Sequence, residues 1–255
     1  MTTNRLRTSV LLLAFAGSFL GANAAQAQSG VFRVYAGIAP TTYRISFDNN
    51  APYANLTAKS SYVAANLGLT WVSPNGIYVD ASGQKSLSAK HDLWEATGDG
   101  TQKFSRDSYT LTGGYIYVFP RGVSVSGFGG YTHGKTTLHA PSGFPWTKDF
   151  FESKGIFIGA GAGVPALSGQ FSGSVAVAGM KGTWKDDNGF DNDAETTLGF
   201  SLGGAYTYKL SESLGLTADL RYQQYKFDFG AQATFPAYTV TEKLVSAGVR
   251  LGYQF

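Results

Sequence analysis

The last residues of the chain, VSAGVRLGYQF, alternate between apolar and polar side chains. Val245, Val249 and Phe255 lie on one face of an extended strand, whereas Ser246 and Arg250 lie on the opposite face. A period of two predicts a β-strand with one apolar and one polar face. The same pattern recurs along most of the chain, which therefore is expected to be an all-β protein.

We predict ten strands, separated alternately by very short and by longer connections. They are expected near Val31–Phe47, Lys59–Ser73, Gly76–Leu87, Arg106–Phe119, Gly122–Lys135, Glu152–Pro165, Gly169–Lys181, Thr196–Leu210, Ser213–Phe227 and Thr239–Phe255. The short connections hold residue types that favour turns, namely Pro74-Asn75, Pro120-Arg121, Ala166 to Ser168 and Ser211-Glu212. Four short periplasmic turns and five longer extracellular loops predict a closed antiparallel ten-stranded transmembrane β-barrel.

The composition of the two faces distinguishes a membrane barrel from a soluble one. In the eighth expected strand, Leu198 and Phe200 lie on one face, and Gly199, Ser201 and Gly203 lie on the other. Small and hydroxyl side chains cannot form a packed core, so the apolar face is expected to meet lipid. Aromatic side chains near the short turns are expected to form a girdle there: Trp71, Phe119, Phe171, Tyr206, Tyr208, Tyr253 and Phe255.

The first expected strand departs from its own alternation. Its apolar positions are even up to Ile38 and odd from Tyr43 onward, with Pro40 in between. One extra residue would restore the face, and proline has no N–H to donate to a neighbouring strand. We therefore predict a β-bulge or break between Ala39 and Thr42.

The first residues have the features of a secretion signal. Arg5 and Arg7 precede the apolar run VLLLAFAGSFL, and Ala25-Gln26-Ala27 is a small-x-small cleavage site. We predict a signal peptide over residues 1–27 and a β-barrel domain over residues 28–255. Beyond the signal, no apolar run reaches the roughly 18 residues that a transmembrane helix needs.

Charge and cysteine content exclude several classes of function. Without the signal the chain has 18 basic and 17 acidic residues, a balance that argues against a nucleic-acid partner. The chain has no cysteine, which excludes a disulfide framework and thiolate metal sites. The acidic stretch DDNGFDNDAE has its glycine too early for a calcium loop of the EF-hand type. We expect no cofactor and no metal.

The signal, the alternating strands and the terminal VRLGYQF resemble those of the small bacterial outer-membrane β-barrel proteins, a porin-like or opacity-type class. The resemblance implies a place in the outer membrane of a Gram-negative bacterium, at the cell surface. In that family, an outward alternation that ends in phenylalanine is similar to the signal that the barrel-assembly machinery reads. The resemblance thus implies an assembly signal at Val249, Leu251, Tyr253 and Phe255, and that machinery as a partner during biogenesis.

Seven lysines project onto the outward face, each roughly 9 to 14 residues from the short-turn end of its strand. They are Lys59, Lys85, Lys135, Lys154, Lys181, Lys226 and Lys243. Ammonium groups at this level would lie near the phosphates of lipopolysaccharide, so we expect the outer-membrane lipid and lipopolysaccharide to contact this rim. The alternative is a rim that is merely polar.

Five ionisable residues are expected to point into the barrel: Arg33, Asp80, Asp219, Arg221 and Arg250. Charges in a confined interior require partners, so we expect a salt-bridge network, which would either stiffen a closed barrel or form a charged constriction in a pore. The opposite wall carries small residues that leave room for water or for long side chains: Gly159, Gly161, Gly163, Ser172, Ser174, Ala176 and Ala178.

Enzymatic functions find little support in the sequence. Ten strands is also the number in the omptin proteases, which use an aspartate pair and an Asp-His pair at the outer rim. Here His91 adjoins Asp92, and Asp191 and Asp193 share a loop, but no spacing places such pairs on facing strands. A Ser-His hydrolase resembling the lipid A deacylases lacks its constellation in the same way. We therefore expect solvated histidines and no catalytic residues.

Two non-enzymatic functions remain open at this point. A surface, structural or binding protein would use the five loops and the basic rim, whereas a narrow channel for ions or small solutes would use the lumen. Both need the same barrel, so the sequence does not rank them. It does not identify an extracellular ligand, a receptor or an oligomeric state.

Overall fold

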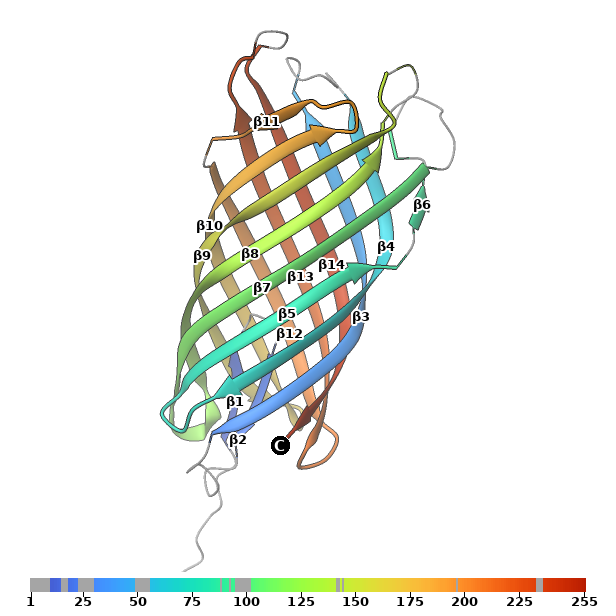
Figure 1. Ribbon diagram of the computed structural model, residues 1–255. Coiled ribbons are helices and arrows are strands. Elements are labelled where there is room, and N and C mark those ends of the chain that lie inside the picture. The colour runs from blue at the N-terminus through green and yellow to red at the C-terminus, as the bar shows by residue number, and fades with distance from the viewer. Residues whose placement is uncertain are drawn as a thin grey trace, which may run out of the picture.

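The computed structural model describes residues 10–14, 18–22, 30–48, 56–87, 89–91, 93–94, 102–140, 143, 145–195, 197–232 and 236–255. Ten long strands form a closed antiparallel β-barrel, which confirms the predicted fold class (Figure 1). They are β3 (Val31–Phe47), β4 (Thr57–Val72), β5 (Ile77–Ser86), β7 (Gln102–Val118), β8 (Ser124–His139), β9 (Lys148–Ala166), β10 (Gly169–Asp186), β12 (Thr197–Lys209), β13 (Leu214–Phe229) and β14 (Tyr238–Gln254).

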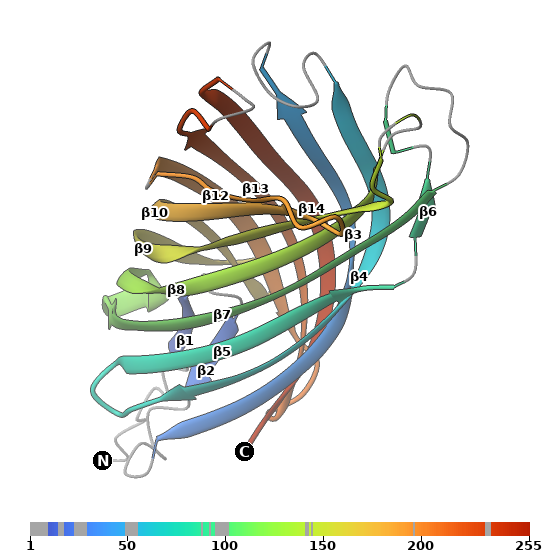
Figure 2. The ribbon, with the colours of Figure 1, turned by 45° about the horizontal axis from the view of Figure 1, so that its top comes forward.

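Each barrel strand pairs with its neighbours in chain order, and β14 pairs with β3 to close the ring (Figure 2). The short strands β6 (Ala89–His91) and β11 (Asp191–Asp193) add to β7 and β10. Within the predicted signal, β1 (Val10–Ala14) and β2 (Ser18–Ala22) pair with each other. Among the described residues, no helix is long and apolar enough to span a membrane.

The two ends of the barrel differ as expected. At one end, here called the short-turn end, the strands are joined by brief turns, and the chain terminates there (Figure 1). Leu167 and Ser168 form a two-residue turn between β9 and β10, with φ values of 49° and 60°. Positive φ at both positions matches a type I′ turn, whose twist suits antiparallel strands. All five longer connections are at the opposite end, called the loop end.

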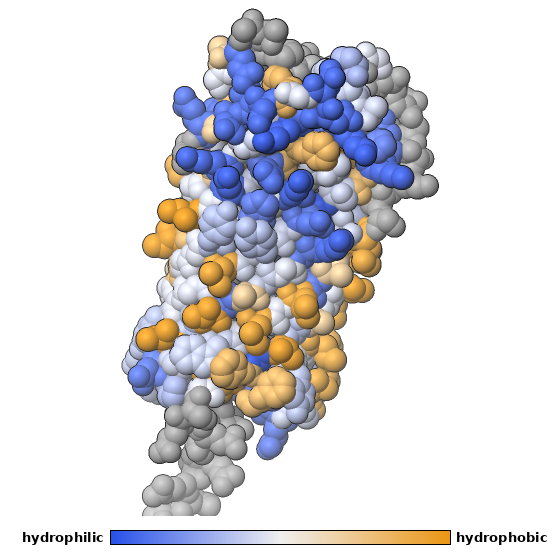
Figure 3. Space-filling view, viewed as in Figure 1, coloured by the Kyte–Doolittle hydropathy of each residue, from blue (hydrophilic) through white to orange (hydrophobic). Residues whose placement is uncertain are grey.

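In the short-turn half of the barrel, large apolar side chains point outward and small or polar ones point inward. On β7, Leu111 and Tyr115 are about half exposed, whereas Thr112 between them is buried. On the face that Figure 3 shows, apolar side chains gather over the lower part of the barrel. The outer apolar band includes Phe32, Val34, Ile38, Leu67, Leu69, Val79, Leu111, Tyr115, Val125, Ile156, Ile158, Val175, Val177, Phe200, Leu220, Val249 and Leu251.

In the loop half, the polarity of the two faces is inverted. On β13, Phe227 and Phe229 point inward and are buried, while Lys226 is exposed. The inward side chains form one apolar cluster, called the loop-end core. Its buried members are Tyr43, Ile45, Phe47, Ala58, Tyr62, Ala64, Leu93, Trp94, Phe104, Leu138, Phe151, Ala178, Met180, Trp184, Ala194, Tyr225, Phe227, Phe229, Tyr238, Val240 and Leu244. This half resembles a soluble barrel, which fills its interior with apolar side chains.

The inversion overturns the predicted bulge in β3. The register of β3 with β4 runs without interruption from Val31 to Ser46. Toward β14, the pairing skips only Ala39 and Pro40 and resumes in the same register, which fits the missing N–H of proline. The bulge is absent because Tyr43 is not on the outward face: it belongs to the loop-end core, so no extra residue is needed to turn it around. The alternative prediction, a break, is confirmed on the β14 side alone, at Ala39 and Pro40.

A smaller apolar cluster lies inside the barrel near the short-turn end. This short-turn core consists of Val72, Tyr78, Ile116 and Phe128. Gly159 of β9 lies directly opposite Phe128 of β8 and gives its ring room: a Cβ atom on Gly159 would lie 2.5 Å from that ring. At this position, the glycine accommodates a large side chain of the neighbouring strand.

Candidate functional site

The five charged residues predicted for the lumen lie on the inner side of their strands. Arg33, Asp80 and Arg250 are buried, and Asp219 and Arg221 are half-buried. Arg250 Nη2 lies 3.0 Å from Asp219 Oδ2, and both side chains are about 10% exposed. These two residues are diagonal neighbours on adjacent strands, because Asp219 of β13 pairs with Gly248 of β14 and Arg250 pairs with Thr217.

Asp80 is held by hydroxyl groups deep in the short-turn half. Thr70 Oγ1 donates a hydrogen bond of 2.6 Å to Asp80 Oδ2, and the Tyr35 hydroxyl donates one of 3.2 Å to the same atom. The ring of Tyr35 also lies under the guanidinium of Arg250, 5.5 Å from its centroid. Tyr35 therefore links Asp80 to the ion pair of Arg250.

A second charged pair in the lumen was missed by the sequence analysis. Arg106 Nη1 lies 2.7 Å from Glu242 Oε1, with the two side chains 7% and 0% exposed. Arg106 also donates to the Thr136 hydroxyl and lies over the ring of Tyr43, 5.2 Å from its centroid. The two residues are 136 positions apart, so local spacing gives no sign of them. Projecting every ionisable residue onto the inner face would have found both.

All seven predicted rim lysines are exposed on the outer face of the barrel. The pairing register places them relative to one another. Lys243 of β14 lies opposite Arg44 of β3, which in turn lies opposite Lys59 of β4. Lys154 and Lys181 also face each other directly on β9 and β10. Arg44 is exposed and points outward. The predicted bulge would have placed it on the inner face, so it was not among the predicted rim residues.

Lys243, Arg44 and Lys59 form a triad of neighbouring cations on β14, β3 and β4. Among the described residues, this triad has no acidic partner. Within the described part of the chain, none of the three forms an ion pair, and Arg44 Nε donates only to the Ser46 hydroxyl at 3.3 Å. Elsewhere on the rim, Lys226 Nζ lies 3.8 Å from Asp228 Oδ1. The ammonium of Lys135 lies over an aromatic ring, that of Phe150.

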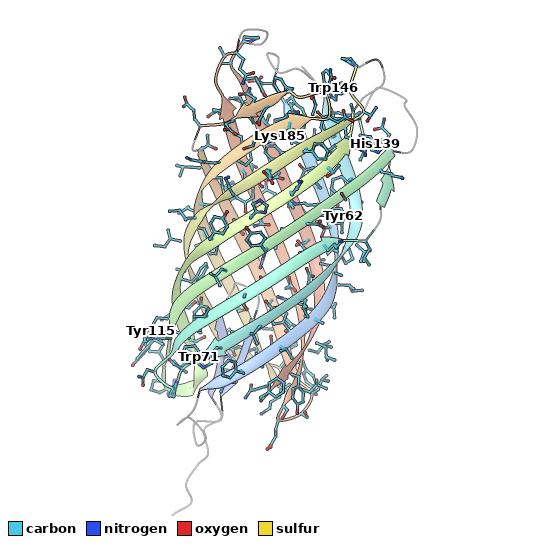
Figure 4. The ribbon with its side chains drawn as sticks, in the orientation of Figure 1. Tyr62, Trp71, Tyr115, His139, Trp146 and Lys185 are labelled. Atoms are coloured by element: carbon cyan, nitrogen blue, oxygen red, sulfur yellow. The ribbon has the colours of Figure 1, made fainter. Side chains whose placement is uncertain are left out.

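The residues of the predicted assembly signal are exposed on the outward face of β14 and just beyond it. Val249, Leu251 and Tyr253 are about half exposed, and Phe255 is 73% exposed. The backbone N–H of Phe255 donates to the carbonyl of Phe32, which fastens the end of the chain to β3. Trp71 and Tyr115 lie at the same end of the barrel, whereas His139, Trp146 and Lys185 lie at the loop end (Figure 4).

The loop-end acids are engaged in local contacts. Lys185 Nζ lies 2.7 Å from Asp191 Oδ2, and Thr183 donates to Asp193. His91 has no described side chain, and Asp92 lies outside the described residues. His133 stacks on Tyr109 on the outside of the barrel, and its Nε2 lies 3.7 Å from Glu152 Oε1.

The loops at this end also carry one carboxylate with a shifted pKa. The hydroxyl and the backbone N–H of Thr147 donate to the carboxylate of Asp187, with the N–H at 2.9 Å. These hydrogen bonds lower the pKa of Asp187 below the usual value of an aspartate. Among the described residues, no group of three or more histidine and acidic side chains is placed to hold a metal ion.

Comparisons with known proteins give fold relatives alone. No family model and no curated protein matches the chain. The outer membrane protease OmpT from Escherichia coli is similar with a TM-score of 0.55 at 10% identity, over 89% of this chain and 97% of that chain. The translocator domain of the autotransporter NalP from Neisseria meningitidis has a TM-score of 0.50 at 14% identity, over 90% of each chain. The chain has the fold of an outer-membrane β-barrel.

In an outer-membrane β-barrel, about 9 to 11 residues of each strand cross the hydrocarbon. Strands such as β9, with 19 residues, are much longer than this. The outer apolar band of the short-turn half thus faces lipid, and the loop half, with its polar outside and apolar inside, stands beyond the hydrocarbon. The outer surface changes from apolar to polar toward the loop end (Figure 3). The seven rim lysines and Arg44, together called the rim cations, follow the outer apolar band along their strands on the loop side.

Proposed function

We propose that this outer-membrane β-barrel has a non-enzymatic role at the bacterial cell surface and that its rim binds the phosphates of lipopolysaccharide. The observation that carries the proposal is the triad of Lys243, Arg44 and Lys59, side by side on three neighbouring strands. Directly opposite residues have Cβ atoms about 5 Å apart, and like charges at that distance destabilise a sheet. A bound phosphate would relieve this repulsion.

The chemistry of the triad suits a phosphate group. Arginine presents a planar fork of donors that matches phosphate oxygens, and lysine adds a mobile positive charge. The triad lies at the edge of the outer apolar band, so a lipid whose acyl chains contact the band brings its head group to this level. The opposed pair of Lys154 and Lys181 offers a second position of the same kind.

The filling of the lumen supports a surface role over the alternative of a narrow channel. The loop-end core occupies the interior at the end through which a solute would enter from outside. Its members Tyr43, Phe151 and Phe227 are fully buried. A conducting path through this half would have to displace these side chains.

The route to the membrane is part of the same proposal. Residues 1–27 would direct export and be removed, and the barrel-assembly machinery would read the terminal alternation that ends in Phe255. The exposure of Tyr253 and Phe255 on the outer side at the end of the chain supports this function.

The test compares two double variants of the mature protein expressed in a Gram-negative outer membrane. Arg44→Gln/Lys243→Gln removes two charges of the triad, and Arg121→Gln/Lys209→Gln removes two charges at the short-turn end as a matched control. After mild detergent extraction, lipopolysaccharide is quantified per barrel. We expect the triad variant to retain at least tenfold less, because each hydrogen bond to a charged group is worth about 1.5–3 kcal/mol and the loss of a single one already gives a factor of about ten. Equal retention by both variants would exclude the proposed site.

A further inference from the structure

Two adjoining cavities lie in the middle of the barrel. The first holds about 660 Å³ of empty space and the second about 620 Å³, both including space that is open to solvent. Ser82, Thr110, Arg221 and Gln223 line both, so the cavities form one chamber. Leu244 and Tyr225 of the loop-end core border the chamber on one side, and Phe128 of the short-turn core borders it on the other.

Arg221 differs from two other arginines of this lumen, Arg250 and Arg106. Arg250 is paired with Asp219, and Arg106 is paired with Glu242. Arg221 forms no ion pair and no hydrogen bond with any side chain or backbone group in the described part of the chain. Its neighbours in the register are Gly203 and Ser246, whose small side chains leave the guanidinium room in the chamber. A partly enclosed charge without a counter-ion is costly, so this guanidinium favours a bound anion.

The geometry of the guanidinium limits the kind of anion that suits this position. Arginine presents a planar fork of N–H donors, which a carboxylate matches with its two oxygens. A carboxylate at Arg221 would give this guanidinium the counter-ion that Asp219 gives to Arg250 and that Glu242 gives to Arg106.

The other side of the chamber is apolar. Phe128, Phe157, Ala176 and Ala178 line the second cavity, together with Arg221. The rings of Phe128 and Phe157 are edge to face, with centroids 6.3 Å apart. A flat apolar group packs well against such a pair. The same cavity thus offers a cation and an apolar wall to one ligand.

We propose that the chamber binds a small monocarboxylate with an apolar body. Arg221 holds the carboxylate, and Phe128 and Phe157 contact the body. This site is distinct from the lipopolysaccharide rim, which lies on the outside of the barrel, so either can fail without the other.

The experiment uses benzoate as the probe and benzamide as its neutral counterpart. The mature protein is refolded in detergent with either compound at constant ionic strength, and thermal unfolding is followed by circular dichroism. Supplying the compound during refolding makes its later entry into the chamber unnecessary. A ligand that binds only the folded state raises the unfolding temperature. We expect a rise with benzoate and an apparent affinity at least tenfold weaker for benzamide.

Variants assign the effect to the chamber. Arg221→Gln should lose the benzoate effect, Arg221→Lys should keep part of it, and Arg121→Gln, at an exposed turn, should keep all of it. Folding of each variant is verified by its heat-dependent migration on a gel. The proposal is overturned if benzoate stabilises Arg221→Gln as much as the parent, if benzamide equals benzoate, or if neither compound has an effect. Stabilisation by acetate equal to that by benzoate would overturn the apolar contact.

Discussion

Arg106 and Glu242 form a buried charged pair whose members depend on each other. Removing one charge leaves the other uncompensated in the interior, which costs about 3–5 kcal/mol, whereas an apolar replacement of both is often neutral. We expect Glu242→Gln to lower the free energy of unfolding in urea by that amount, and Arg106→Met/Glu242→Leu to restore most of it. The control is Asp191→Asn, which breaks the exposed pair with Lys185 and should cost less than about 1 kcal/mol. Equal costs for Glu242→Gln and Asp191→Asn would contradict this assignment.

The contact between Asp187 and Thr147 is predicted to depend on pH. Its pKa is lowered in the folded protein by hydrogen bonds from Thr147, so the contact stabilises the loop above the unfolded pKa and is lost as pH falls through the folded pKa. We expect the amide resonance of Thr147 to titrate with a midpoint below the ordinary aspartate value of about 3.9. The Asp187→Asn variant should show no such titration. A midpoint at or above the ordinary value would show that the contact does not form.

At the scale of the strand, the inversion of polarity makes a prediction on a single face of β7. Leu111 and Ser105 both point outward, the first in the outer apolar band and the second in the loop half. A lysine at the bilayer midplane costs about 2–4 kcal/mol, and one near the interface costs about 0–1 kcal/mol. In lipid vesicles, we expect Leu111→Lys to lower the free energy of unfolding by about 2–4 kcal/mol and Ser105→Lys to lower it by about 0–1 kcal/mol. Similar costs at the two positions would contradict a membrane boundary between Leu111 and Ser105.

The strands show what alternation can and cannot predict. The limits of β3 follow from the sequence because a period of two is a local property, and the outward face of the short-turn half follows from its small inward residues. Alternation does not tell whether an apolar face meets lipid or a core. Tyr43 was therefore explained by a bulge, and the same error removed Arg44 from the predicted rim. Contacts across the lumen, such as that of Arg106 with Glu242, depend on ring closure, which no local pattern contains.

The whole molecule combines two kinds of barrel in one ring of strands. The short-turn half has a lipid-facing outside and a polar, charged inside, and the loop half has a polar outside and an apolar core. The chamber at Arg221 lies between the two cores. Apolar side chains pack in the lumen at the loop end, and the two proposed binding sites lie at the cations of the outer rim and in the chamber.

Planar-bilayer conductance of the refolded mature protein tests this account most directly. Correct folding is first shown by heat-dependent migration, and currents are then recorded over a range of voltages. The account predicts no discrete current steps, because the loop-end core, including Phe151 and Phe227, fills the interior. Regular steps from a folded protein would contradict it and would place a continuous pore through the loop-end core.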